Sequence, residues 1–104
     1  MVTQSAAIET VKQLAKEIKE LGLHLQKVVL YGSYARNEQR EQSDIDVALV
    51  ADEFEGVGFM DIPLFVKVLR NRTLIHPRTY STADYRQGDP FLEEIIRTGI
   101  EIEV

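Results

Sequence analysis

Two aspartates one residue apart, Asp44 and Asp46, stand before an apolar run near the middle of this chain of 104 residues. In a strand, residues i and i+2 point to the same side, with Cα atoms roughly 6.5–7 Å apart. Two carboxylates at that spacing repel each other unless a cation lies between them, and hard oxygen ligands suit Mg²⁺ or Mn²⁺. We therefore predict that Asp44 and Asp46 bind metal and are the catalytic residues of a site.

A glycine and a serine, Gly32 and Ser33, lie upstream of this pair in the pattern G-S-x10-D-x-D and follow another apolar run. Glycine lets the backbone come close to a ligand, and a short helix over Ser33–Glu38 would direct free N–H groups toward an anion. The Ser33 hydroxyl and the Arg36 guanidinium suit phosphate oxygens. Each pair alone is a weak signal, but together they predict a metal-bound triphosphate held by Gly32, Ser33 and Arg36.

Strands must position these residues, and the spacing of apolar side chains predicts where strands and helices lie. Spacings of three and four residues indicate helices, and continuous β-branched runs indicate inner strands. The predicted fold is an α/β (α+β) domain over residues 1–104, with a small mixed sheet and helices packed on it. The predicted elements are helices over Ser5–Leu21 with Ser5 as N-cap, over Asp61–Arg70, and from Asp89-Pro90 to Gly99, and strands over Leu25–Tyr31, Asp44–Val50, Arg72–Tyr80 and Ile100–Val104.

The strand predicted over Asp44–Val50 has two different faces. Its odd positions are Ile45, Val47 and Leu49, so one face is apolar throughout. Its even positions begin with the two aspartates and then become apolar, so the other face is acidic only at its beginning. The acidic segment 51–58 that follows is predicted to be a solvated, mobile loop.

The overall composition narrows the classes of function. The formal net charge of −5 argues against broad nucleic-acid binding, because that needs a basic face to displace counterions. The chain has no cysteine, so disulfides and thiolate–zinc sites are impossible. No apolar run approaches the ~18 residues needed to cross a bilayer, and the first residues lack the pattern of a signal peptide. A cytoplasmic protein is therefore expected.

The stretch GSYARNEQREQSDIDVALV resembles the signature of the minimal nucleotidyltransferases, small members of the DNA polymerase beta-like nucleotidyltransferase superfamily. The order of elements and the closing DPFLEEIIRTGIEI extend the resemblance over most of the chain. The resemblance implies that Gly32 and Ser33 contact the triphosphate and that Asp44 and Asp46 are the metal-binding catalytic pair. It also implies transfer of a nucleoside monophosphate, AMP from ATP, to a hydroxyl with release of pyrophosphate, supported by Mg²⁺ or Mn²⁺.

The same resemblance implies a partner. Related minimal proteins are often paired with a helical HEPN-domain protein in toxin–antitoxin systems, where some add AMP to the toxin. A HEPN-type partner is therefore expected as the acceptor, with this chain as the antitoxin. The apolar edge segment Ile100–Val104 also leaves a homodimer open.

Two positions depart from the family pattern. Asn37 stands where the family often has glycine, and asparagine tolerates left-handed dihedral angles better than most residues. His76 stands where similar proteins carry a third carboxylate, in the predicted strand LIHPRTYS, where Pro77 indicates either an edge strand or the end of the pairing. Histidine is a poor match for Mg²⁺. A second hypothesis therefore stays open, in which the chain is a weakly active or inactive interaction module of the same fold.

Overall fold

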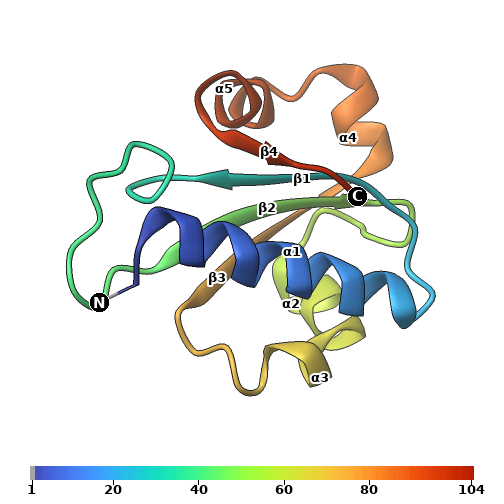
Figure 1. Cartoon of the computed structure of the whole chain (residues 1–104). Coiled ribbons are helices and arrows are strands. Elements are labelled where there is room, and N and C mark those ends of the chain that lie inside the picture. Colours follow the sequence, from blue (N-terminus) through green and yellow to red (C-terminus); the bar gives the residue numbers. More distant parts are fainter. Residues whose placement is uncertain (1) are drawn as a thin grey trace.

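The computed structural model describes residues 2–104, which form a four-stranded sheet with helices on both faces (Figure 1). This arrangement confirms the predicted α/β class with a small mixed sheet. The elements are α1 (Gln4–Glu20), β1 (Leu25–Tyr31), β2 (Ile45–Ala51), α2 (Gly58–Asp61), the 3₁₀ helix η1 (Ile62–Leu64), α3 (Val66–Leu69), β3 (Ile75–Ser81), α4 (Thr82–Gln87), α5 (Pro90–Thr98) and β4 (Ile100–Ile102).

The strands lie in the order β3-β2-β1-β4. β1 runs antiparallel to β2 and to β4, whereas β2 runs parallel to β3. The register places Tyr31 beside Asp46 and Asp46 beside His76, so three strands contribute to one row across the sheet. β3 is an edge strand, as predicted from Pro77, because proline has no N–H to donate to a second neighbour.

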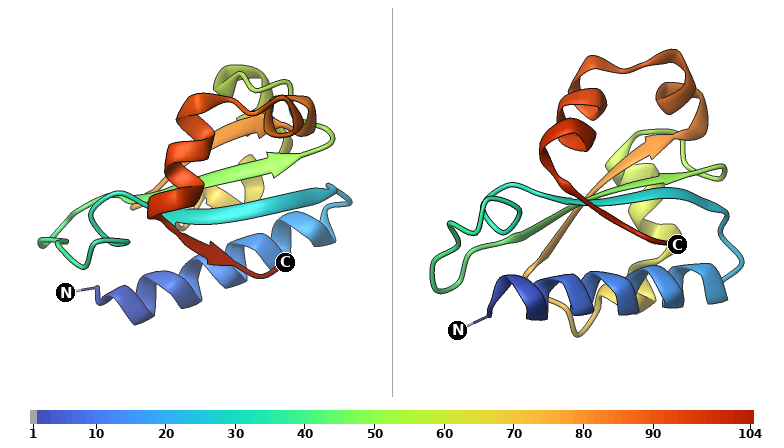
Figure 2. Two further views of the ribbon diagram at one scale, coloured as in Figure 1. Left: turned by 90° about the horizontal axis from the view of Figure 1, so that it is seen from above. Right: turned by 45° about the horizontal axis from the view of Figure 1, so that its top comes forward.

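The two faces of β2 pack against different helices. Val47 and Leu49 belong to the larger core, together with Leu14 of α1. Ala48 belongs to a smaller core on the other face, together with Leu92 of α5. Figure 2 shows α1 and α5 on opposite sides of the sheet. The predicted two-faced strand is therefore confirmed, and its acidic face is the one that α5 partly covers.

Helix α1 begins earlier than predicted. The hydroxyl of Thr3 accepts a hydrogen bond from the amide of Ala6 at 3.1 Å, so Thr3 is the N-cap and Ser5 lies inside the helix. Thr3 caps the helix because its side-chain oxygen reaches the amide of Ala6, the third residue of the helix, which has no partner within the helix. The helix ends at Glu20, and Gly22 reverses the chain with a φ of 94°.

The segment predicted as one helix over Asp61–Arg70 is three short pieces, α2, η1 and α3. Pro63 lies within η1 and has no N–H for a longer helix. Asp61 is buried, and its carboxylate accepts hydrogen bonds of 2.7 to 3.0 Å from the amides of residues 55–57 and the hydroxyl of Thr79. The loop after β2 is therefore pinned to β3 by a buried carboxylate, in contrast to the mobile loop that we predicted.

The C-terminal part contains one helix that the sequence did not predict. Ser81 and Asp84 form a capping box at the start of α4, each side chain accepting from the other's amide. The predicted start of α5 is confirmed, because Asp89 caps it and Pro90 is its first residue. Other boundaries shift slightly: β2 begins at Ile45, β3 at Ile75, and β4 ends at Ile102. Over residues 2–104, no helix has the length and apolar character needed to cross a membrane.

Candidate active site

The centre of the candidate site is Asp46, the second residue of β2. Its neighbours across the sheet are Tyr31 on β1 and His76 on β3, and all three lie on the face that α5 partly covers. The His76 ring nitrogen Nδ1 lies 3.3 Å from Asp46 Oδ1. The position at which we expected a third carboxylate is thus directly beside Asp46, and it holds an exposed imidazole.

Gly32 is in direct contact with this aspartate. Its φ is 75°, a left-handed conformation, and a Cβ atom at this position would lie 2.4 Å from Asp46 Oδ2. Such a distance is far shorter than a van der Waals contact, so a side chain here would displace the carboxylate. The structure therefore brings the predicted glycine and the predicted aspartate together, and glycine is required for both conformation and space.

The segment predicted as a short helix over Ser33–Glu38 is instead a tight turn. The amides of Arg36 and Glu38 donate to the carbonyls of Gly32 and Ser33, and Asn37 closes the turn with a φ of 56°. Asn37 thus occupies a left-handed position, which glycine also adopts readily and which asparagine tolerates better than most residues. In the described chain, the amides of residues 33–35 donate to no backbone carbonyl, so they remain available for an anion.

The turn is fixed to the body of the protein at two points. The Tyr34 side chain is buried in the larger core, with 1% of its surface exposed. The side-chain amide of Gln4, the first residue of α1, donates to the carbonyl of Tyr34 at 2.8 Å. The backbone beside Asp46 is therefore held rigidly before any ligand binds.

Two other predicted residues make no hydrogen bond or ion pair with Asp46 within residues 2–104. Asp44 lies one residue before β2, is exposed, and has no hydrogen bond or ion pair within residues 2–104. Arg36 is also exposed, and its Nε donates to Glu38 Oε1 at 2.5 Å. Among the described residues, no three His, Cys, Asp or Glu side chains are grouped closely enough to hold a metal ion by themselves.

Arg78 is a basic residue on the same face that the sequence interpretation missed. It pairs with Ala48, two residues along β3 from His76. Its guanidinium lies 4.6 Å from the centre of the Phe91 ring and 5.8 Å from that of Tyr80. The sequence did contain a signal for this position: Arg78 is two residues from His76, and residues i and i+2 of a strand lie on the same face.

Burial and neighbouring charges shift the pKa of Tyr31, which lies beside Asp46 in the sheet. Burial raises the pKa of the Tyr31 hydroxyl above 10.0, and the negative charge of Asp46 raises it further, whereas the positive charge of Arg78 opposes the rise. The phenol is therefore neutral at physiological pH and can act only as a neutral hydrogen-bonding group. The carboxylate and the guanidinium both influence this one side chain, so they share the same part of the sheet face.

A cleft of about 500 Å³ opens beside Gly32. This volume lies within the range typical of small-molecule sites. One wall comes from the end of β1 and the following turn, and the other comes from α5. The lining residues are Tyr31, Gly32, Arg36, Pro90, Phe91, Glu94, Ile95 and Thr98.

Comparison with known proteins gives results that agree with this geometry. Residues 11–97 match the nucleotidyltransferase domain family. Three proteins of Methanocaldococcus jannaschii, each named as a candidate protein adenylyltransferase, are similar to this chain. They are 29% identical over 98 residues (91% of this chain, 97% of the relative), 37% identical over 62 residues (60% of each), and 43% identical over 67 residues (64% and 67%).

A solved structure is similar in fold. The crystal structure of a candidate nucleotidyltransferase from Sulfolobus solfataricus superposes with a TM-score of 0.64 at 20% sequence identity, covering 81% of this chain and 75% of the other. At this level of identity the likeness concerns the fold alone. It supports the assignment of the mixed sheet and its helices to the nucleotidyltransferase fold.

Proposed function

Because this chain belongs to the nucleotidyltransferase domain family, we propose that it transfers AMP from ATP to a hydroxyl group and releases pyrophosphate. In this reaction the acceptor oxygen forms a bond to the α-phosphorus, the bond from that phosphorus to the bridging α–β oxygen breaks, and the acceptor loses its proton. The observation that carries the proposal is the contact between Gly32 and Asp46, because it puts an anion-accepting turn against a carboxylate.

The residues present fit a divalent cation such as Mg²⁺ or Mn²⁺. Gly32 leaves free the space beside Asp46 Oδ2 that a Cβ would fill. Mg²⁺ is usually held by one or two carboxylates together with substrate phosphates, so Asp44 and Asp46 suffice without a third protein ligand. When bound, such an ion neutralises triphosphate charge and favours ionisation of the attacking hydroxyl.

The chain's own residues supply positioning and charge. The amides after Gly32 and the Ser33 hydroxyl would seat the β and γ phosphates. Arg36 would exchange its contact with Glu38 for a phosphate oxygen. Since the turn is anchored by the buried Tyr34, it offers these donors without reorganisation, which is how preorganised groups stabilise charge in a transition state.

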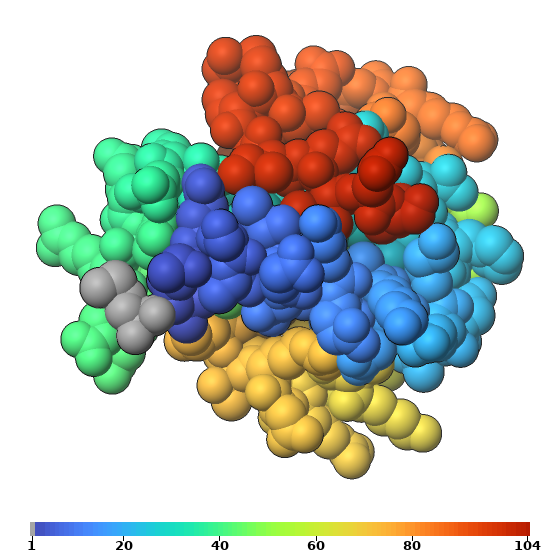
Figure 3. Space-filling model, in the orientation of Figure 1, coloured from blue at the N-terminus to red at the C-terminus, as the bar shows by residue number. Residues whose placement is uncertain are grey.

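A protein acceptor is the proposal that the relatives favour, since their names describe candidate protein adenylyltransferases. A helical HEPN-type partner, with this chain as its antitoxin, is the form that we propose. Several exposed apolar side chains in one segment of the chain support a protein partner, because exposed apolar surface marks interaction sites. In Figure 3 the yellow atoms at the lower edge of the molecule belong to the region of α3, where this segment ends. The segment comprises Val57, Phe59, Met60, Leu64 and Val66, with Phe59 83% exposed.

A second function is favoured by one specific observation. His76 holds the place beside Asp46 where the family has a carboxylate. In this second proposal the chain keeps the fold and the partner surface but transfers nucleotides weakly or not at all. Replacement of His76 by glutamate separates the two, because a large gain in transfer would favour the module, whereas an already active wild type with no gain would exclude it.

The first experiment is a calorimetric titration of ATP in the presence of Mg²⁺ or Mn²⁺. We expect the wild type to bind, and the double variant Asp44→Asn/Asp46→Asn to lose binding. Asp52→Asn is the matched control, since it removes a carboxylate at the opposite end of β2 and should bind normally. Equal binding by the wild type and the double variant would contradict the assignment of the aspartates.

Transfer itself is measured with ATP labelled at the α-phosphate. Label that becomes attached to an acceptor protein, with pyrophosphate released in equal amount, is the expected result. Binding of ATP without any transfer to protein, RNA or small-molecule hydroxyls would instead support the interaction module.

A further inference from the structure

Phe91 is exposed at a place where the core does not need it. It is the second residue of α5, and its ring is 60% exposed, whereas its neighbour Leu92 and the next-turn residue Ile95 are buried against the sheet. Helix α5 is therefore seated by other residues. The Phe91 side chain instead forms part of the wall of the cleft beside Gly32.

The Phe91 ring is held from one side by a cation. The Arg78 guanidinium lies 4.6 Å from the ring centre, at a distance typical of a cation–π contact. Arg78 comes from β3 and Phe91 from α5, so the contact fixes the ring across two elements. A fixed aromatic ring in the wall of a small-molecule-sized cleft is the arrangement on which planar bases stack.

The cleft is continuous with the phosphate turn, because Gly32 both lines it and contacts Asp46. A triphosphate seated at Gly32 must direct its nucleoside into this cleft or out into solvent. The charges suit the first direction: Arg36 lies at the Gly32 wall, and Glu94 lies on the α5 wall, where a carboxylate can accept from ribose hydroxyls.

We propose that this cleft binds the nucleoside of the triphosphate, with the base stacked on Phe91 and Arg78 holding the ring in place. The inference rests on the proposed function, because it takes the phosphates to lie at Gly32. Stacking tolerates every base, since each has a π face. The site therefore contributes affinity for nucleotides in general rather than a strict choice of base.

The test compares two ligands by calorimetry, each with Mn²⁺: the non-transferable analogue α,β-methylene-ATP and inorganic tripolyphosphate, which has no nucleoside. The wild type should bind the analogue more tightly than tripolyphosphate. Phe91→Ala should weaken binding of the analogue about 5- to 150-fold, as expected for loss of one stacked base, and leave the affinity for tripolyphosphate unchanged. Phe91→Trp should restore tight binding of the analogue, since tryptophan also offers a stacking surface.

Tyr85→Ala is the matched control. Tyr85 is also a partly exposed aromatic with a cation near its ring, Lys27 at 5.5 Å, but it lies outside the cleft. The Tyr85→Ala variant should bind both ligands with the affinity of the wild type. Equal affinity of the wild type for the two ligands, or an equal loss of both in Phe91→Ala, would overturn the nucleoside site alone. Failure of the wild type to bind either ligand would overturn the proposed function and this inference together.

Discussion

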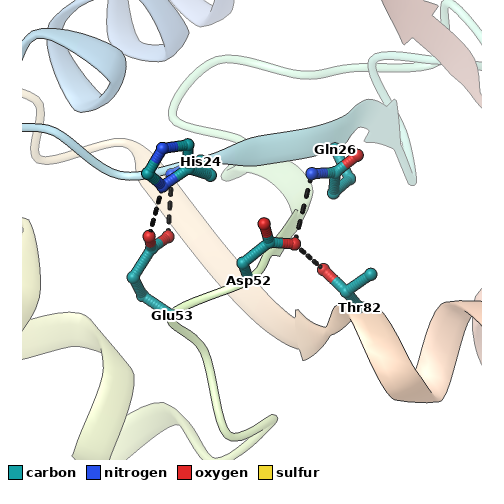
Figure 4. A network of polar contacts seen from close by, with 5 residues as sticks. All are labelled: His24, Gln26, Asp52, Glu53 and Thr82. Atoms are coloured by element: carbon teal, nitrogen blue, oxygen red, sulfur yellow. Dashed lines mark hydrogen bonds and ion pairs between the residues drawn. The ribbon is translucent and has the colours of Figure 1, made fainter.

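Acidic residues lie at both ends of strand β2, and they differ in how many hydrogen bonds their carboxylates make. After its last residue, Asp52 accepts hydrogen bonds from Gln26 at 3.2 Å and from Thr82 at 2.6 Å. Next to it, Glu53 accepts from the backbone amide of His24 at 2.7 Å and contacts the His24 ring (Figure 4). These contacts join the ends of β1, β2 and β3, so the fold itself uses these carboxylates.

The other end of β2 leaves its carboxylates largely unused. Within residues 2–104, Asp44 has no hydrogen-bonding partner, and the side chain of Asp46 has one such partner, His76 at 3.3 Å. The comparison teaches that acidic residues committed to the fold can be told from those kept for a ligand by their partners, and the following predictions test that distinction.

The largest expected effect is that of Gly32→Ala. The new Cβ would meet Asp46 Oδ2 at 2.4 Å, so the carboxylate must move. To restore an ordinary contact distance the carboxylate must move by about 1 Å, and a misplacement of that size should lower nucleotide transfer by about 10²-fold. Gly22→Ala is the matched control, because it has a similar φ of 94° but open space around the added atom.

Both glycine variants should lose stability by about 1 kcal/mol, since each forces alanine into a left-handed conformation. Only Gly32→Ala should lose transfer. Equal transfer rates in the two variants, measured on folded protein, would mean that the position of Asp46 does not matter to the reaction.

The next effect is on stability. Asp61→Asn removes the charge from a buried carboxylate that accepts four hydrogen bonds, so we expect unfolding to become easier by about 2–4 kcal/mol. Asp44→Asn should change stability by less than about 0.5 kcal/mol, because that carboxylate is exposed and has no partner in the described chain. Denaturant unfolding measures both changes. A large loss of stability in Asp44→Asn would contradict the distinction between carboxylates used by the fold and those left for a ligand.

A smaller effect is expected for His76→Glu. A carboxylate beside Asp46 in place of an imidazole adds a negative charge and an oxygen ligand, so affinity for Mg²⁺ should rise about tenfold. Affinity for Ni²⁺ should fall, because imidazole suits that metal better. Titration of each metal in the presence of ATP provides the measurement, and unchanged preference would show that His76 lies outside the metal's surroundings.

The smallest effect concerns the His24–Glu53 pair. The hydrogen bond to Glu53 raises the pKa of His24 from 6.5, and the same bond lowers the pKa of Glu53 from 4.5. A raised histidine pKa gives stability that is complete below 6.5 and is lost as the pH rises through the raised value. A lowered glutamate pKa gives stability present above 4.5 and lost as the pH falls through the lowered value.

The advantage of the wild type over His24→Gln should therefore be greatest between about pH 4.5 and 6.5 and smaller on either side. Thermal unfolding across this range gives the measurement. Because both groups are exposed, the change in Tm should be slight. An advantage that grows above pH 7 would contradict the pairing.

The sequence predicted the strands well because their side chains face two packed layers. The bounds of β1 were right, and the alternation along β2 correctly placed Val47 and Asp46 on opposite faces of the strand. Hydrophobic periodicity reports burial, and burial decides these strands. The contact of Asp46 with Gly32 agrees with the predicted pairing of the two motifs, although the roles of these residues in binding and transfer stay predictions.

What the sequence could not provide depends on contacts between distant residues. The attachment of the loop after β2 follows from a hydrogen bond that Thr79 donates to Asp61, 18 positions away. The position of Arg78 against Phe91 follows from the packing of α5 on β3. Two local signals were overlooked: the Ser81 and Asp84 capping pattern of α4, and the spacing that puts Arg78 on the same face as His76.

The pairing register of β1 and β2 has a consequence for how such a protein can vary. Asp46 faces the same side as Tyr31 because the two residues are paired, and a slip by one position would bring Ile45 or Val47 opposite Tyr31. Which face of the sheet carries the carboxylate therefore depends on whether its position in β2 is odd or even. A residue inserted into β2 between Asp46 and Ala48 would turn this carboxylate to the α1 side, away from Gly32, while the rest of the strand kept its pairing.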